Sequence, residues 1–284
     1  MVLKEIIIVE NNRENTAPVG VFDSGVGGLT VAREIMRQLP MENVVYFGDT
    51  ARVPYGSKSK DIITKYSRQI IRFLLTENVK AIVIACNTAS ALAIDTMQKE
   101  FDIPIIGVVK PGAKVAAATT VNGNIGLIGT EATIHSGMYT EFIKSIKPDA
   151  NVIGKPCPLF VPLVEEGMLH DTITDQVAER YLNELKDKNI DTLIMGCTHY
   201  PLLRSTIGKV MGQGVNLVNP AYETAIELKR VLERNNLANV CDIDSPSSMY
   251  RFYVSDAAEK FKAFANSILP FDITMTKQIN IEQY

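Results

Sequence analysis

Several features that would direct an interpretation are missing from this sequence of 284 residues. Acidic residues (32) and basic residues (29) nearly balance, so nothing indicates a basic surface that binds nucleic acid. No apolar stretch approaches the roughly 18 residues that a membrane-spanning helix requires. The apolar run Ile6–Val9 is short and is followed by acidic and amide residues, unlike a signal peptide. These absences predict a soluble, cytoplasmic protein without nucleic-acid or membrane partners.

The four cysteines lack the spacing of a disulfide framework. Cys86, Cys157, Cys197 and Cys241 form no Cys-x-x-Cys pair. Cys86 and Cys197 end apolar runs, which is unlike a surface cross-link, so we expect a reducing compartment. We interpret Cys157, which lies between two prolines, and Cys241 as structural.

The stretch Asp191–Pro201 places a thiol at the end of a predicted strand. Its apolar run, residues 193–195, stops at Gly196 and is followed by Cys197. Pro201 then opens a predicted helix, near the first position, where its missing N–H costs nothing. In open α/β sheets, ligands bind at the carboxyl ends of strands. A helix N-terminus there favours an anion and is expected to lower the pKa of the thiol.

A second stretch repeats this arrangement. Residues 79–89 also run from an apolar strand through a small residue to a cysteine, Cys86, and then to a helix. Earlier in each half, residues 20–25 are matched by residues 126–131, at a similar distance before the cysteine. We interpret the chain as two similar α/β halves, each of which presents one cysteine.

Alternating strands and helices predict an α/β fold with mostly parallel sheets. We expect a first domain at residues 18–110 and 220–284, a second at 111–219, and an N-terminal extension at 1–17. Strands are predicted at residues 18–22, 43–47, 79–85, 103–109, 124–128, 151–154, 193–195, 214–220 and 251–254. Helices are predicted at residues 29–39, 58–77, 89–100, 113–119, 131–146, 173–188, 221–235 and 256–268.

Two thiols facing each other across a cleft suit the inversion of a carbon that carries an acidic proton. One thiolate removes the proton from one face while the other thiol delivers a proton to the opposite face. A free thiol has a pKa of about 8.5, which its surroundings can shift in either direction. Asp23 ends the first strand and could exchange a proton with Cys86. His199 could do the same for Cys197, with a carboxylate such as Glu165 orienting the ring.

Small polar side chains follow several predicted strands, in front of helix N-termini. Hydroxyl and amide groups in such positions suit a carboxylate. The substrate should therefore be small and anionic, and an amino acid fits. The candidates for this contact are Ser24, Asn87, Thr88, Thr130, Thr133 and Thr198.

Five motifs, in order along residues 18–255, resemble those of the glutamate racemases in the aspartate/glutamate racemase family. They are residues 20–28, 51–56, 85–89, 158–167 and 196–201. The resemblance implies an isomerase that interconverts L- and D-glutamate without a cofactor or metal. It would supply D-glutamate for peptidoglycan synthesis, and so serve cell wall biogenesis and cell shape. Cys86 would take the proton from D-glutamate and Cys197 from L-glutamate, assisted by Asp23, Glu165 and His199.

The same resemblance implies a fold, an assembly and a set of substrate contacts. The fold would be two similar three-layer α/β domains related by a pseudo-twofold, with the active site in the cleft between them. A homodimer is expected. The choice of Glu165 over Glu166 depends on the motif alignment alone. Substrate contacts would come from Asp23, Ser24, Tyr55, Gly56, Asn87, Thr88, Thr198 and His199.

Other interpretations remain open from the residues themselves. The glycine-rich turn 25–28 could bind phosphate, although it lacks the Lys-Ser/Thr of a P-loop and the spacing of a dinucleotide fold. Cys197 and His199 could bind zinc together with Cys86, although the usual zinc spacings are absent. The substrate could be another acidic amino acid such as aspartate. A two-lobed amino-acid-binding module without catalysis would have the same cleft but leaves the paired cysteines unexplained.

Overall fold

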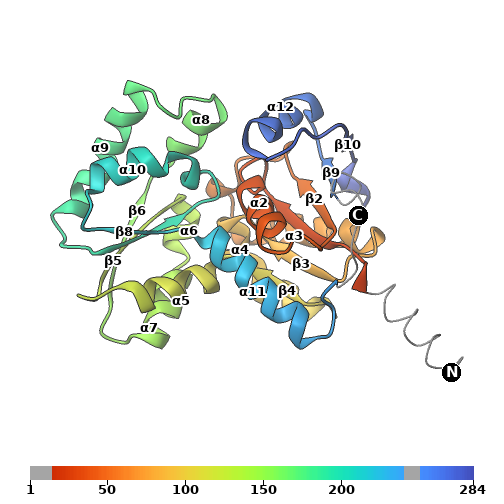
Figure 1. Ribbon diagram of the computed structural model, residues 1–284, viewed down its shortest axis with the longest axis horizontal. Helices are drawn as coiled ribbons and strands as arrows, with labels where there is room; N and C mark the ends of the chain where they lie inside the picture. Colours follow the sequence, from red (N-terminus) through yellow and green to blue (C-terminus); the bar gives the residue numbers. More distant parts are fainter. Residues whose placement is uncertain (1–14, 240–249) are drawn as a thin grey trace, which may run out of the picture.

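The computed structural model describes residues 15–239 and 250–284. Most of the expected extension, residues 1–14, therefore lies outside the described residues, as does Cys241. The described chain forms two parallel β-sheets that lie side by side, each covered by helices (Figure 1). None of the described helices combines the length and apolar character needed to cross a membrane.

The larger sheet has six strands in the order β10-β9-β2-β1-β3-β4, and all its neighbours pair in parallel. Five of the six were predicted within a few residues. The sixth, β10, was missed because three residues carry no periodic pattern. The strands are β1 (Val19–Asp23), β2 (Val44–Gly48), β3 (Ala81–Ile84), β4 (Ile105–Gly107), β9 (Tyr250–Val254) and β10 (Thr276–Gln278).

The smaller sheet has four parallel strands in the order β6-β5-β7-β8. This order matches β2-β1-β3-β4 of the larger sheet, so β1 corresponds to β5 and β3 to β7. The correspondence between the two halves is therefore confirmed by topology, whereas the domain boundaries at 110 and 220 stay a prediction. The strands are β5 (Asn124–Gly129), β6 (Asn151–Pro156), β7 (Thr192–Gly196) and β8 (Asn216–Val218).

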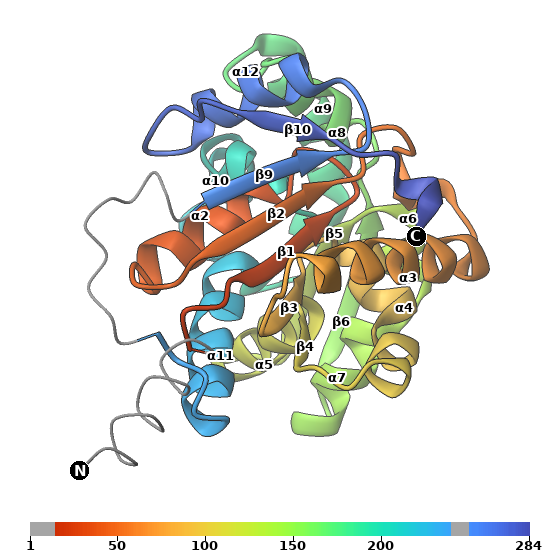
Figure 2. The same cartoon turned by 90° about the vertical axis from the view of Figure 1, so that its right-hand side faces the viewer.

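Both faces of the larger sheet are buried, because successive residues of a strand point to opposite sides. Val19 and Val21 pack with helices α2 (Leu29–Gln38), α11 (Pro220–Arg234) and α12 (Ala258–Ile268). Phe22 points the other way, toward α3 (Lys60–Thr76) and α4 (Asn87–Glu100). Figure 2 shows α2 and α11 on one side of this sheet and α3 and α4 on the other.

The smaller sheet is covered in the same way, which confirms three layers in each half. Leu127 packs with helices α5 (Val109–Thr119) and α7 (Met138–Ile146). Its neighbour Ile128 packs on the opposite face. The helices there are α8 (Phe160–Glu165), α9 (Thr172–Lys186) and α10 (Arg204–Met211).

Two predicted elements differ from the structure for local reasons. Strand β4 ends at Gly107 and α5 begins at Val109, so Pro111 lies in the first turn of a helix, where proline is tolerated. The helix predicted at 131–146 is divided into α6 (Glu131–His135) and α7. Gly137 between them has φ +72°, a left-handed conformation that ends one helix and begins the next.

Candidate active site

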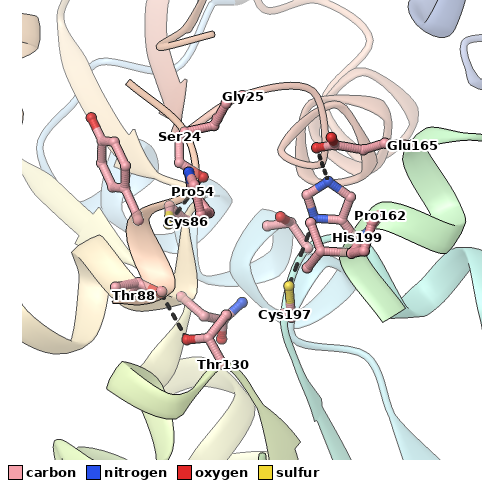
Figure 3. Close-up of a pocket in the computed structure, with 16 residues that line it drawn as sticks. Ser24, Gly25, Pro54, Cys86, Thr88, Thr130, Pro162, Glu165, Cys197 and His199 are labelled. Carbon is pink, nitrogen blue, oxygen red and sulfur yellow. Dashed lines mark hydrogen bonds and ion pairs between the residues drawn. The ribbon is translucent and has the colours of Figure 1, made fainter. Parts of the chain in front are cut away.

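One pocket lies where the carboxyl ends of the two sheets meet. Its volume is about 290 Å³, and its wall contains residues that follow β1, β2, β3, β5 and β7. Figure 3 shows Cys86 and Cys197 on opposite sides of this pocket, with Thr88 and Thr130 below Cys86. The lining residues are Ser24, Gly25, Val53, Pro54, Tyr55, Gly56, Cys86, Asn87, Thr88, Thr130, Val161, Pro162, Glu165, Cys197, Thr198 and His199.

Cys86 occupies the N-cap of α4, two residues after the end of β3. Its side chain is buried, and its Sγ lies 3.6 Å from Oγ of Ser24. Burial raises the pKa of the thiol to about 12, and the nearby charge of Asp23 acts in the same direction. The backbone N–H of Ala89 at the helix start opposes this rise but is outweighed. The lowering of a thiol pKa that was expected at such a helix N-terminus is therefore not found at Cys86, because loss of hydration exceeds the helix effect.

Cys197 lies on the opposite wall with His199 and Glu165. Its Sγ is 3.7 Å from Nδ1 of His199, and Nε2 of the same ring is 3.0 Å from Oε1 of Glu165. The three groups that the sequence placed together are thus in contact (Figure 3). Glu166 instead lies on the exposed side of the turn, 3.5 Å from Lys260. The structure therefore distinguishes Glu165, which contacts His199, from Glu166, which does not, whereas the residues alone gave no reason to prefer either.

The contacts of His199 with Cys197 and Glu165 favour the positively charged form of its ring. Burial alone lowers the pKa of His199, but its hydrogen bonds to Cys197 and Glu165 outweigh burial and raise the pKa to about 10. The hydrogen bond to His199 in turn lowers the pKa of the Glu165 carboxyl. Near neutral pH, the ring is therefore positively charged and its two partners lie on opposite sides of it.

Asp23 lies behind the pocket and is completely buried. Its carboxylate accepts hydrogen bonds from the backbone N–H of Gly25 (3.0 Å) and from the hydroxyl of Thr198 (3.4 Å). Burial raises the pKa of this carboxyl, although the charge of His199 opposes the rise. Asp23 is not among the lining residues, so its predicted roles in substrate contact and in proton exchange with Cys86 stay predictions.

The expected hydroxyl and amide groups join the two halves at the floor of the pocket. The hydroxyls of Thr88 and Thr130 lie 2.9 Å apart, and Thr130 contacts Thr133 at 3.0 Å. Thr133 is buried behind Thr130 and does not line the pocket. The hydroxyl of Tyr139, from the other half, donates a hydrogen bond of 2.7 Å to Oδ1 of Asn87.

Four apolar lining residues were not singled out from the sequence. Val53 and Pro54 belong to the motif at 51–56, while Val161 and Pro162 belong to the motif at 158–167. The motifs therefore identified these segments. Their apolar side chains have no acid–base or hydrogen-bonding groups, so nothing in the sequence marked them as site residues. None of the described residues that line the pocket is a lysine or an arginine. Within residues 15–239 and 250–284, no group of three His, Cys, Asp or Glu side chains has the arrangement of a metal site.

Comparison with known proteins shows which protein family the chain belongs to. Residues 22–227 match the model of the Asp/Glu/Hydantoin racemase family. The chain belongs to this family. The match covers the smaller sheet and, in the larger sheet, runs from the end of β1 through β4, so it includes both cysteines of the pocket. The expected family and class of enzyme, a racemase and therefore an isomerase, are confirmed.

Individual relatives are similar over nearly the whole chain. Glutamate racemase of Geobacter metallireducens is 45% identical over 264 residues, covering 93% of this chain and 97% of that protein. The structure of glutamate racemase isoform RacE1 from Bacillus anthracis has a TM-score of 0.88 at 39% identity and covers 93% of this chain and 97% of that one. The structure of glutamate racemase from Francisella tularensis in complex with D-glutamate has a TM-score of 0.87 at 39% identity. The match covers 95% of this chain and 100% of that one. These structures confirm the predicted fold class.

Proposed function

We propose that this protein interconverts L- and D-glutamate by a two-base mechanism in which Cys86 and Cys197 exchange protons with the two faces of the α-carbon. One observation carries the proposal: the two buried thiols lie on opposite walls of a single pocket (Figure 3). The choice of glutamate is supported by the relatives, several of which are glutamate racemases with 44–49% identity.

The surroundings of the thiols suggest how L-glutamate is converted. Nδ1 of the His199 ring lies 3.7 Å from Sγ of Cys197, within reach to exchange a proton with this thiol. Cys197, acting as the base, takes the α-proton of L-glutamate, and the C–H electron pair remains on the substrate. Cys86, kept as a neutral thiol by burial, gives its proton to the opposite face of the carbanion. The reverse reaction begins with Cys86 as the base.

Neutral donors would bind the substrate carboxylates, since the part of the chain that the structure describes places no cationic lysine or arginine in the pocket wall. The hydroxyl groups of Thr88, Thr130 and Thr198 are available, together with the amide of Asn87. The N-terminus of α4 adds backbone N–H groups and a favourable dipole. Such preorganised donors also stabilise the negative charge that develops when the α-proton leaves.

The wider biological role follows from the same family resemblance. We infer that the product D-glutamate serves peptidoglycan synthesis, and that the enzyme acts in the cytoplasm as a homodimer without a cofactor. The supporting observation is the similarity of the whole chain to bacterial glutamate racemases.

Deuterium exchange with optical detection tests the reaction directly. The purified protein is incubated with L-glutamate in deuterium oxide, without pyridoxal phosphate and with a chelator. We expect both the α-proton signal and the optical rotation to decay. Proton loss without inversion would leave only one working base and overturn the two-base mechanism. If neither signal changes with glutamate, aspartate is tested next, and failure with both would favour a binding module.

A further inference from the structure

Arg52 is a buried cation next to the pocket, and its Nε and Nη1 atoms have identifiable partners, whereas its buried Nη2 has none among the described residues. Its side chain is only 9% exposed. Its Nε lies 2.7 and 3.0 Å from the two carboxylate oxygens of Asp49, and its Nη1 lies 2.6 Å from Oε1 of Gln69. The guanidinium also stacks 4.0 Å from the ring centroid of Tyr66. Such contacts hold the planar group in one position and orientation.

The same carboxylate connects Arg52 to the wall of the pocket. Asp49 is completely buried, and it accepts hydrogen bonds from the hydroxyls of Tyr55 and Ser255. Tyr55 lines the pocket, as do its neighbours in the loop Val53–Gly56. Arg52 directly precedes this loop, so both ends of the loop are held at one buried charge. A change in the position of Arg52 must therefore move the pocket wall.

The C-terminal segment, residues 280–284, contacts Arg52 from the outside. Oε1 of Glu282 lies 3.1 Å from Nη1 of Arg52, and its Oε2 accepts a hydrogen bond of 3.3 Å from Gln69. Ile281 is buried in the core, and the ring of Tyr284 packs edge-on against Phe73 of α3. Figure 2 shows the C-terminus beside α3.

We propose that Arg52 is a positioning residue that presents the loop Val53–Gly56 to the substrate, and that Glu282 of the C-terminal segment keeps Arg52 in place. The inference rests on the proposed function, because affinity for glutamate is its readout. A loop that is already ordered before binding spares the substrate the cost of ordering it. Neither residue is among those lining the pocket, so both act on affinity rather than on proton transfer.

Substitutions in the exposed C-terminal segment test this connection without disturbing the core. Glu282, whose side chain is 59% exposed, is changed to Ala and to Gln, and the neighbouring exposed Gln283 is changed to Ala as a control. Glu282→Ala should raise KM for both enantiomers by about two- to fivefold, as expected for loss of an ion pair whose carboxylate is largely exposed, with kcat unchanged. Glu282→Gln keeps an oxygen acceptor and should restore part of the affinity. Gln283→Ala should match wild type.

Substitution of Arg52, the buried partner of Glu282, provides a second test. Arg52→Lys keeps the charge but loses the planar fork, and should raise KM by about tenfold or more. Calorimetric titration with D-glutamate should show Kd rising in parallel with KM. A lower melting temperature with unchanged KM and Kd in Glu282→Ala would show a merely structural role and overturn the inference, as would an equal effect of Gln283→Ala. If wild type binds D-glutamate but does not racemise it, the proposed function fails, while the Kd comparison still decides the role of Arg52.

Discussion

Gly27 and His199 approach each other across the two halves so closely that no side chain fits between them. A Cβ atom at position 27 would lie 2.5 Å from Cε1 and from Nδ1 of the histidine ring, and 2.5 Å from the hydroxyl of Thr198. The glycine-rich turn after β1 is thus a packing surface for the ring that lies beside Cys197. A phosphate-binding role for this turn, left open by the sequence, is not needed to explain its glycines.

Gly27→Ala should therefore impair catalysis more than folding. The added methyl group must displace the ring of His199, and misplacement of a catalytic group by about 1 Å lowers the rate on the order of 100-fold. Racemisation of L-glutamate and the melting temperature are measured together. Gly214→Ala is the control, since nothing lies within 4 Å of the added atom there. Wild-type activity in Gly27→Ala would contradict the assigned position of the ring.

Cys86→Ser and Cys197→Ser should each lower racemisation in both directions by about 100-fold or more, because a hydroxyl is a far weaker acid than a thiol and scarcely forms the anion that would act as the base. Circular dichroism should show an unchanged fold. Cys157→Ala provides the control, since this buried thiol does not line the pocket. Full activity in either serine variant would exclude the two-base mechanism.

Glu165→Gln should lower the pKa of His199 from about 10, because the variant removes the negative charge that stabilises the imidazolium. The chain has only three histidines, so the ring protons of His199 can be assigned by substitution and followed by NMR titration. Glu166→Gln should leave the titration unchanged, since Glu166 faces Lys260. An equal shift in both variants would refute the choice of Glu165.

The raised pKa of His199 makes the stability of the folded state dependent on pH. Folding raises the pKa of His199 above its usual 6.5, so this residue stabilises the folded state fully below about pH 6.5. The contribution is lost as the pH rises through about 10. Urea unfolding of wild type and His199→Asn should therefore show a stability difference that shrinks between pH 6.5 and 10. A difference that grows over this interval would contradict the sign of the shift.

Tyr139→Phe tests a contact that crosses the two halves. Loss of its hydroxyl leaves Asn87 without the hydrogen bond that orients its amide in the pocket. We expect KM for glutamate to rise about three- to tenfold, the usual range for one buried hydrogen bond, with a small effect on kcat. Tyr222→Phe serves as a control outside the pocket. An unchanged KM in Tyr139→Phe would show that Asn87 does not depend on this contact.

The positions of the two cysteines could be predicted from the sequence because the signal for each is local. An apolar run followed by a small residue and a polar turn marks the end of a buried strand, and parallel strands bring their carboxyl ends to one edge. Cys86 and Cys197 therefore follow β3 and β7, as expected. The choice of glutamate and the assistance of Glu165 came from motif resemblance.

The tertiary structure decided what depends on segments that are distant along the chain. Burial of Cys86 by several elements raises a pKa that the helix N-terminus alone was expected to lower. The contact of Arg52 with Glu282 joins residues that are 230 positions apart in the sequence, and no local pattern predicts it. Strand and helix propensities depend on a few neighbouring residues. Desolvation and charge pairing instead depend on all the groups that the fold places around a side chain, however distant they are in the sequence. The sequence alone therefore determined which residues can do the chemistry, and the fold determined their charge states and their supports.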